Sequence, residues 1–234
     1  ALYEDFADMA QSIARRSRYL KNFAAAVSHE FKTPLAGIRG AVELIEDHGE
    51  SMSEADLKRF LGNITADTER LSALVSRLLD QARADMARPE TGASSDVASV
   101  LGRVADAMRS DVFAILVEGA DALPRAAMAE PTFETILIGL AENARQAGAG
   151  ALTFTASRDV ADLVLVAQDD GPGIAPADRE RMFEPFFTTR RAEGGTGLGL
   201  SIARSLIEGH LGEIDLVPGD SGTAFRIVLP LVRG

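Results

Sequence analysis

The chain of 234 residues contains no cysteine. Disulfides, thiolate zinc sites, iron–sulfur clusters and cysteine nucleophiles are therefore excluded, and the absence fits a reducing compartment. Basic residues are also in deficit, with 24 Lys and Arg against 35 Asp and Glu and a formal net charge of −11. This balance disfavours a broad phosphate-tracking surface, so we do not expect DNA or RNA to be the main ligand.

Long apolar runs are missing as well. No uninterrupted run approaches the roughly 18 residues of a membrane span, and the chain opens in a charged helical stretch rather than a signal peptide. Hydrophobic residues make up 46% and charged residues 25% of the sequence, which is typical of a globular chain and excludes global disorder. The length allows one large domain or two small ones.

Proline is scarce in the first third, where Pro34 is the one proline before residue 89. Apolar residues recur at steps of three or four over residues 20–45 and again over 57–82, which predicts two long amphipathic helices. The break at residues 48–51 and the helix-start residues Ser53, Glu54 and Asp56 that follow it predict an antiparallel hairpin. A lone hairpin cannot cover both apolar stripes, so we expect dimerisation into a four-helix bundle.

The sequence changes character after residues 89–95, whose proline, glycine and serines are typical of a linker. Behind this linker, short strand-like runs are mixed with helical patterns, which predicts an α+β fold: an α/β sandwich with helices on one face of a mixed sheet. The predicted helices cover residues 96–109, 131–147, 176–182 and 198–209, and the predicted strands cover residues 112–117, 151–157, 163–167 and 225–229.

A histidine in the first predicted helix is a candidate nucleophile. At about 100° per residue, His29 of the segment SHEFKTPL points away from the buried stripe. Glu30 beside it could orient the ring and accept a proton, and Thr33 lies one turn further along the same face. Pro34 removes a backbone hydrogen bond just beyond the site. An ordinary surface histidine is the alternative, whereas zinc is excluded because HEFKT lacks the second histidine of the zinc motif.

Two glycine-rich segments point to a nucleotide. In DDGPGI, Asp169 ends a predicted strand, where its carboxylate can accept a hydrogen bond from an exocyclic amine such as that of adenine, and the glycines let the backbone turn around a flat ring. A surface turn is the alternative. GGTGLGL, residues 194–200, precedes a helix, where free amides and the helix dipole favour phosphate. Its spacing matches neither a P-loop nor a dinucleotide fingerprint, and its leucines argue against a flexible linker.

Two further segments extend this site. Asn143, on the predicted helix 131–147, is a candidate Mg²⁺ ligand because Mg²⁺ prefers oxygen atoms; a structural asparagine is the alternative. The segment FEPFFTTRR, residues 183–191, leads from aromatic residues into the second glycine segment, an arrangement typical of a lid over a ligand. Arg190 and Arg191 are candidate phosphate ligands. A plain hydrophobic anchor is the alternative for the phenylalanines, and it is compatible with a lid.

Taken in this order, SHEFKTPL, GLAENARQ, DDGPGI, FEPFF and GGTGLGL resemble the H box, N box, first glycine box, F box and second glycine box of sensor histidine kinases of two-component systems. The resemblance covers about residues 20–231. It implies a signalling-helix extension at 1–20, a dimerisation and histidine phosphotransfer hairpin at 21–88, the linker at 89–95 and a Bergerat-type catalytic ATP-binding domain of the gyrase-like superfamily at 96–234.

The resemblance also implies roles for individual residues, with ATP and Mg²⁺ as cofactors. His29 would accept the phosphoryl group, Glu30 would act as the base and Thr33 would position water for dephosphorylation of the partner. Asn143 would hold Mg²⁺. The implied nucleotide site comprises Asn143, Arg145, Asp169, Gly171, Gly173, Ile174, Arg190, Arg191, Gly195, Thr196, Gly197, Leu198, Gly199 and Thr223, with Asp169 and Thr223 at the adenine.

Two positions depart from the family's N box. Gly139 stands where the family often has asparagine, and Gln146 stands where it often has lysine. One polar contact and one phosphate contact are therefore open, and Arg145, Arg190 and Arg191 are the candidates to replace the lysine.

The expected function is an ATP-dependent autokinase that phosphorylates His29 and passes the phosphoryl group to an aspartate of a response regulator, with phosphatase activity on that partner. The resemblance implies a homodimer in the cytoplasm, the catalytic part of an inner-membrane sensor whose membrane region lies outside this chain. A gyrase-like ATP hydrolase and a nucleotide-binding dimeric scaffold without kinase activity are the alternatives.

Overall fold

The structure, a computed structural model, describes residues 2–120, 123–190, 195–218 and 222–232, with side chains from residue 21 onward except Asn22. The chain divides into two compact units, Ala1–Arg77 and Leu78–Gly234. This division falls inside a helix, ahead of residue 88, where the sequence predicts the end of the hairpin domain. None of the helices in the described part of the chain is long and apolar enough to cross a membrane.

The first unit is the predicted antiparallel hairpin of α1 (Leu2–His48) and α2 (Glu54–Asp85). The last turns of α2, from Leu78 onward, belong to the second unit. Helix α1 continues through Pro34. Ser53 caps α2: the Asp56 amide donates to Ser53 Oγ at 3.1 Å, and Ser53 Oγ donates to Asp56 Oδ2 at 2.7 Å. Because this reciprocal cap satisfies amides that have no partner inside the helix, it sets where α2 begins.

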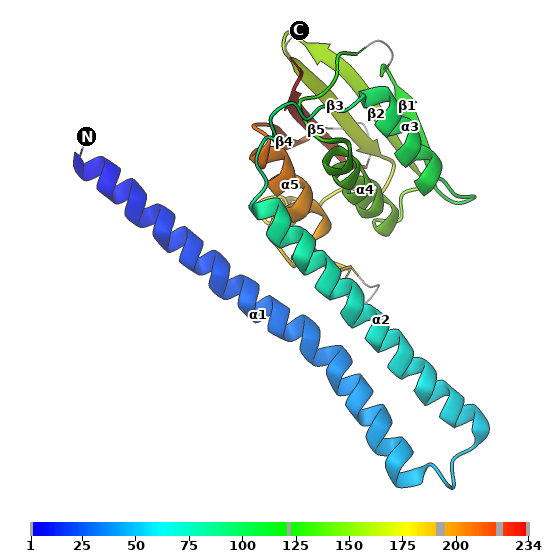
Figure 1. Cartoon of the computed structure of the whole chain (residues 1–234). Helices are drawn as coiled ribbons and strands as arrows, with labels where there is room; N and C mark the ends of the chain where they lie inside the picture. The colour runs from blue at the N-terminus through cyan, green and yellow to red at the C-terminus, as the bar shows by residue number, and fades with distance from the viewer. Residues whose placement is uncertain (1, 121–122, 191–194, 219–221, 233–234) are drawn as a thin grey trace. The chain divides into compact units, whose positions relative to one another are not determined.

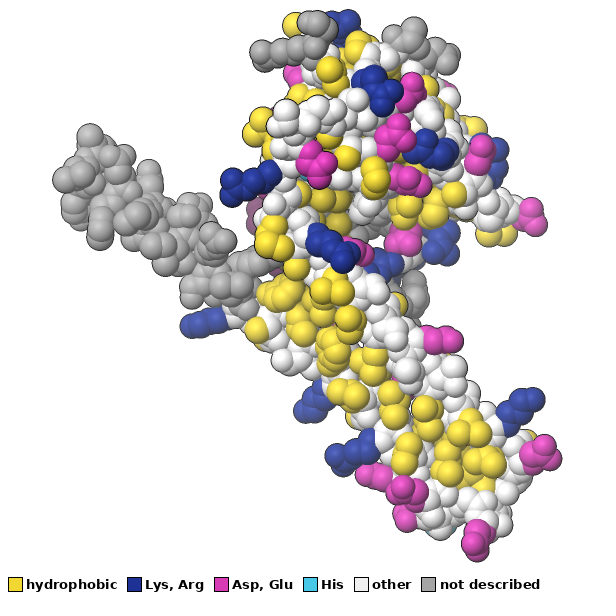
Figure 2. All heavy atoms as spheres, in the orientation of Figure 1, with side chains coloured by type: hydrophobic (Ala, Val, Ile, Leu, Met, Phe, Trp, Pro, Cys, Tyr) yellow, Lys and Arg dark blue, Asp and Glu magenta, His cyan; other side chains and the backbone are white. Residues whose placement is uncertain are grey.

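Apolar side chains run along the hairpin and gather on its surface (Figure 2). Ala41 and Leu74 are buried between the helices. In contrast, Leu35 and Leu61 are 52% and 51% exposed, and Val75 is 44% exposed. A single chain therefore leaves much of its predicted apolar stripe open to solvent.

The second unit is built on a five-stranded sheet of order β1-β2-β3-β5-β4. Strands β1 and β2 pair in parallel and the other neighbours pair antiparallel, so the sheet is mixed, as the sequence predicts. The strands are β1 (Ala114–Glu118), β2 (Ala151–Asp159), β3 (Asp162–Asp169), β4 (Glu213–Val217) and β5 (Ala224–Pro230).

Helices α3 (Val97–Met108), α4 (Glu130–Gln146) and α5 (Gly199–Gly209) cover one face of this sheet (Figure 1). The core lies between the two layers, where Phe133 and Ile136 of α4 and Phe154 of β2 are fully buried. Strands β2 and β3 alternate buried and partly exposed positions, which is the pattern of a sheet covered on one face. This two-layer arrangement confirms the predicted fold.

Two elements differ from the sequence prediction. The helix predicted over residues 176–182 is only the single 3₁₀ turn η1 (Pro176–Asp178), after which the chain continues in turns that bury Met182 and Phe186. Strand β4 is an element that the pattern analysis did not predict. Its residues alternate, with Ile214 buried between exposed Glu213 and Asp215, but a five-residue strand gives a weak periodic signal.

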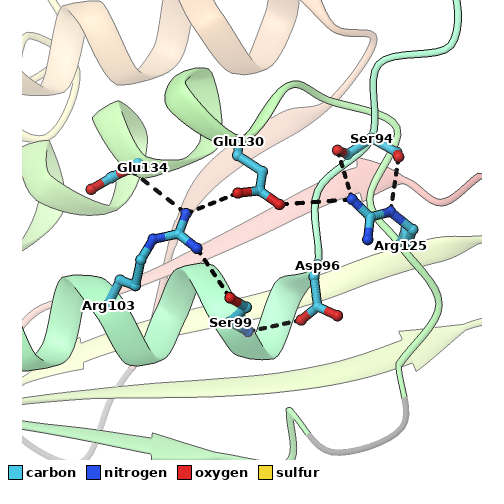
Figure 3. Close-up of polar contacts among 7 residues, drawn as sticks. All are labelled: Ser94, Asp96, Ser99, Arg103, Arg125, Glu130 and Glu134. Atoms are coloured by element: carbon cyan, nitrogen blue, oxygen red, sulfur yellow. Dashed lines mark hydrogen bonds and ion pairs between the residues drawn. The ribbon is translucent and has the colours of Figure 1, made fainter.

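The end of the predicted linker is fixed to the second unit. Ser95 is fully buried and exchanges two backbone hydrogen bonds of 3.0 Å with Ala126. Arg125 donates to the hydroxyl and carbonyl oxygens of Ser94 at 2.9 and 3.1 Å and lies 3.7 Å from Glu130 of α4 (Figure 3). Solvent-exposed ion pairs of this kind add little stability singly, so the buried backbone pairing is the main restraint on this end of the linker.

Candidate functional site

Asp169, the last residue of β3, is a buried carboxylate held in one orientation. It is 4% exposed, and its Oδ1 accepts hydrogen bonds of 2.9 Å from the amides of both Gly171 and Thr223. These two bonds use one carboxylate oxygen, so Oδ2 is left to accept a hydrogen bond from a ligand. A fixed acceptor at a strand end suits recognition of an exocyclic amine.

The neighbouring Asp170 has a different task. Its Oδ1 accepts hydrogen bonds from the amides of Gly150 and Ala151 at 2.8 and 2.9 Å, which ties the end of β3 to the start of β2. The two adjacent aspartates therefore hold different segments: Asp169 holds Gly171 and Thr223, whereas Asp170 holds the start of β2.

Glycines bring the backbone close around Asp169. Gly222, at φ +67°, lies so near Asp169 that a Cβ there would collide with the Asp169 carbonyl oxygen. Gly173, at φ +78°, approaches the Gly222 carbonyl oxygen, which a Cβ would reach at 3.0 Å. Left-handed backbone and such close approach both favour glycine. The first glycine box and the residues Gly222 and Thr223 thus form one wall around the carboxylate, and Ile174 lies half-buried beside them.

The F box and the second glycine box interlock. The Phe186 amide donates to the Gly197 carbonyl oxygen at 2.9 Å, and both residues are left-handed, at φ 65° and 66°. A left-handed phenylalanine is strained. Phe186 is only 3% exposed, so its burial and this hydrogen bond offset the strain. The Gly195 amide donates to the Arg190 carbonyl oxygen at 3.1 Å, so these two described residues are in contact.

One face of α4 runs beside this glycine box. A Cβ at Gly139 would lie 3.3 Å from the Gly199 carbonyl oxygen, so the missing side chain lets α4 and α5 pack closely. Seven residues later, Arg190 Nη1 donates to the Gln146 carbonyl oxygen at 2.5 Å. Asn143 lies between these two contacts on the same face, because positions i, i+4 and i+7 align on a helix. The half-buried Asn143 therefore lies on the side of α4 that contacts Gly199 and Arg190.

The other predicted nucleotide residues are less directly placed. Arg145 is exposed, and two residues from Asn143 it points to a different side of α4. Leu198 is fully buried, so its side chain packs in the core and only its backbone can contribute to the second glycine box. Thr196 is half-buried next to Gly197. Arg191 lies outside the described residues.

In the first unit, His29 and Thr33 are exposed one turn apart on α1. Glu30 instead points into the hairpin: it is 7% exposed, and its Oε2 lies 3.9 Å from Arg70 Nη2 on α2. The sequence predicts Glu30 as a base beside His29. Its ion pair with Arg70 on the other helix of the hairpin has no signal in the sequence periodicity.

Comparison with known proteins matches two domain families to different parts of the chain. The family of histidine kinase-, DNA gyrase B- and HSP90-like ATPases matches residues 128–233, and the His Kinase A phospho-acceptor domain family matches residues 19–87. The sensor protein ChvG of Rhizobium meliloti is 32% identical over 97% of this chain and 43% of its own length. The sensory histidine kinase/phosphatase NtrB of Escherichia coli O157:H7 is 30% identical over 95% of this chain and 64% of its own length.

Solved structures agree. The crystal structure of full-length ShkA in complex with AMPPNP is 27% identical, with a TM-score of 0.63 over 90% of this chain and 46% of that one. The crystal structure of histidine kinase ThkA in complex with the response regulator protein TrrA has a TM-score of 0.71 over 93% of this chain and 64% of that one, at 23% identity, and supports the fold.

The fold and the family matches define an ATPase domain of the histidine kinase-, DNA gyrase B- and HSP90-like family that follows a phospho-acceptor hairpin. The chain belongs to the sensor histidine kinases of two-component systems and contains their catalytic portion. It spans less than two thirds of the length of these curated relatives.

Sequence reasoning did not single out two structural features of the site. Gly222 was not predicted as a site residue, although a glycine directly before Thr223 was the available signal. The contribution of α2 to the second unit, through Gln81, had no signal in the periodicity, because a buried glutamine looks like any polar position of an amphipathic helix.

Proposed function

We propose that this chain transfers the γ-phosphoryl group of ATP to His29 and then passes it to an aspartate of a response regulator. The imidazole nitrogen attacks the γ-phosphorus, the bond from phosphorus to the β,γ-bridging oxygen breaks, and ADP leaves with that electron pair. Phosphohistidine then donates the same group to a carboxylate oxygen. The observation that carries the proposal is the presence in one chain of an exposed His29 on the hairpin and the fixed Asp169 acceptor of the first glycine box.

The described residues can be assigned to steps of nucleotide binding. Asp169 Oδ2 accepts a hydrogen bond from the adenine amine, and the amides at the start of α5 bind phosphate at the positive end of the helix dipole. The Asn143 amide oxygen suits Mg²⁺, with phosphate oxygens and water as the remaining ligands. When bound, Mg²⁺ neutralises phosphate charge during transfer. Arg190 beside Gln146 supplies a cation near the position where the family often has lysine.

Thr33 and the apolar stripe complete the proposal. Thr33, exposed one turn from His29, orients the water that dephosphorylates the regulator. The open stripe with Leu35, Leu61 and Val75 is covered by a second copy of the hairpin, which forms the four-helix bundle. The ThkA–TrrA complex supports a response-regulator partner. From the sensor relatives, we place the chain in the cytoplasm, as the catalytic part of an inner-membrane sensor.

The test is incubation of the full chain with γ-labelled ATP and Mg²⁺. We expect acid-labile, alkali-stable label in wild type and none in His29→Ala. His48→Ala is the matched control, because His48 is another exposed histidine of α1; its loss should leave labelling intact. ATP turnover without label on His29 would favour a gyrase-like hydrolase, and ATP binding with neither would favour a nucleotide-binding scaffold.

A further inference from the structure

The last turns of α2 carry a polar cluster that belongs to the ATP-binding unit. Residues 78–85 of α2 lie in the unit Leu78–Gly234, and Gln81 and Asp85 meet Ser201 and Ser205 of α5. We call these four residues the α2–α5 clasp. Gln81 is 1% exposed and Ser201 is 4% exposed, so the centre of the clasp is buried. A buried glutamine needs partners for both its oxygen and its nitrogen, which makes its contacts specific.

The hydrogen bonds of the clasp fix the orientation of Gln81. Its Nε2 donates to Asp85 Oδ1 at 2.7 Å and lies 3.3 Å from Ser205 Oγ. Ser205 Oγ donates to the same Asp85 oxygen at 2.8 Å. Because the carboxylate only accepts, the nitrogen of Gln81 must face Asp85 and the oxygen must face Ser201.

Ser201 connects the clasp to the second glycine box. Its hydroxyl lies 2.7 Å from Gln81 Oε1 and 3.0 Å from the carbonyl oxygen of Leu198, the residue before α5. A hydroxyl has one proton, and both of these atoms are acceptors. Gln81 therefore shares the Ser201 proton with the backbone of the glycine box. Without Gln81, the hydroxyl would donate only to the carbonyl three residues earlier, a local bond typical of serine in helices.

Backbone packing holds the two segments together beyond the clasp. A Cβ at Gly209, at the end of α5, would lie 2.7 Å from the Ala87 carbonyl oxygen. Ala84, between these contacts, is 2% exposed. The segment 81–87 thus lies along α5 from its first turn to its last, and the clasp is the part of this contact nearest the glycine box.

We propose that Gln81 is a positioning residue for the nucleotide site, acting through Ser201 on the first turn of α5. This inference rests on the proposed binding of ATP phosphates at that turn. Groups that bind a ligand need support from neighbours that hold their geometry. If docking of α2 on α5 improves nucleotide binding, nucleotide binding must strengthen docking by the same factor.

The first test measures the Kd of a non-hydrolysable ATP analogue with Mg²⁺ by calorimetry on the full chain. Gln81→Leu keeps the size and helix propensity of the side chain but accepts no hydrogen bond. We expect its Kd to rise about fivefold, the effect of one neutral hydrogen bond, and Ser201→Ala to behave alike. The double variant should be no worse than either single variant, because both remove the same contact.

Asp80→Asn is the matched control. Asp80 lies beside Gln81 on α2, is exposed, and pairs with Arg83 on the same helix at 3.3 Å. The Kd of the Asp80→Asn variant for the analogue should therefore equal that of wild type. Thermal unfolding without nucleotide identifies any variant that fails to fold. A folded Gln81→Leu protein that binds the analogue as tightly as wild type, or more tightly, overturns the proposal.

Hydrogen exchange gives a readout that a merely structural role would not move. The analogue should slow exchange of amides 78–87 in wild type and leave this segment unprotected in Gln81→Leu. Equal protection in both proteins overturns the linkage. Labelling of His29 is a separate measurement: a Kd shift in a chain that never labels His29 supports this inference while it contradicts the proposed kinase function.

Discussion

Asp169→Asn is the sharpest test of the nucleotide site. The substitution keeps the shape of the side chain, and an asparagine oxygen can still accept the amides of Gly171 and Thr223, both now 2.9 Å from Asp169 Oδ1. The other oxygen becomes an NH₂ group. Where Asp169 presents an acceptor to the adenine amine, the variant presents a donor, so two donors face each other.

The expected loss follows from that single contact. A hydrogen bond to a charged group contributes about 1.5–3 kcal/mol, which corresponds to a rise of about 10- to 150-fold in the Kd for ATP. Stability should change little, because both backbone amides keep their acceptor. Asp169→Ala is the informative companion: it leaves the amides of Gly171 and Thr223 without this acceptor, at about 1–3 kcal/mol for each buried group, so it should also lower the free energy of unfolding.

The assay is calorimetric titration of both variants with ATP and GTP, alongside urea unfolding. Guanine has a carbonyl oxygen where adenine has its amine, so Asp169→Asn should lose less affinity for GTP than for ATP. If the stable Asp169→Asn protein binds ATP with the wild-type Kd, Asp169 does not read the adenine amine, and the assignment of the site around it is wrong.

Three further predictions concern the turn at Asp169 and the hairpin. Gly222→Ala should lower the free energy of unfolding by about 1–3 kcal/mol and weaken ATP binding, because its Cβ would meet the Asp169 carbonyl oxygen; urea unfolding and titration measure both effects. Leu61→Glu should convert a dimer into a monomer in light scattering, since Leu61 lies in the open apolar stripe, whereas Lys58→Glu, the exposed control, should stay dimeric. Thr33→Ala should slow release of phosphate from the phosphorylated regulator without slowing labelling of His29; equal loss of both rates contradicts a specific role in dephosphorylation.

Local sequence patterns predicted much of the fold. The three- and four-residue spacing of apolar side chains predicted α1 and α2, and the structure places the start of α2 at the Ser53 cap that the sequence indicated. Short strand-like runs predicted four of the five strands. These features depend on neighbours within one or two turns or along one strand, so they can be read from the chain without knowing what packs against it. The five boxes likewise identified the family, because each is a short contiguous segment.

Tertiary structure decided which distant segments meet. Asp169 and Thr223 are joined only because β3 and β5 pair side by side, and strand pairing over such a separation has no local signal. Glu30 faces Arg70, and Gln81 is buried against Ser201, because helix packing selects which polar positions face a partner. Periodicity marks one face of a helix as apolar, but it does not specify the register or the neighbour, which depend on complementary shape and hydrogen bonding across the whole unit.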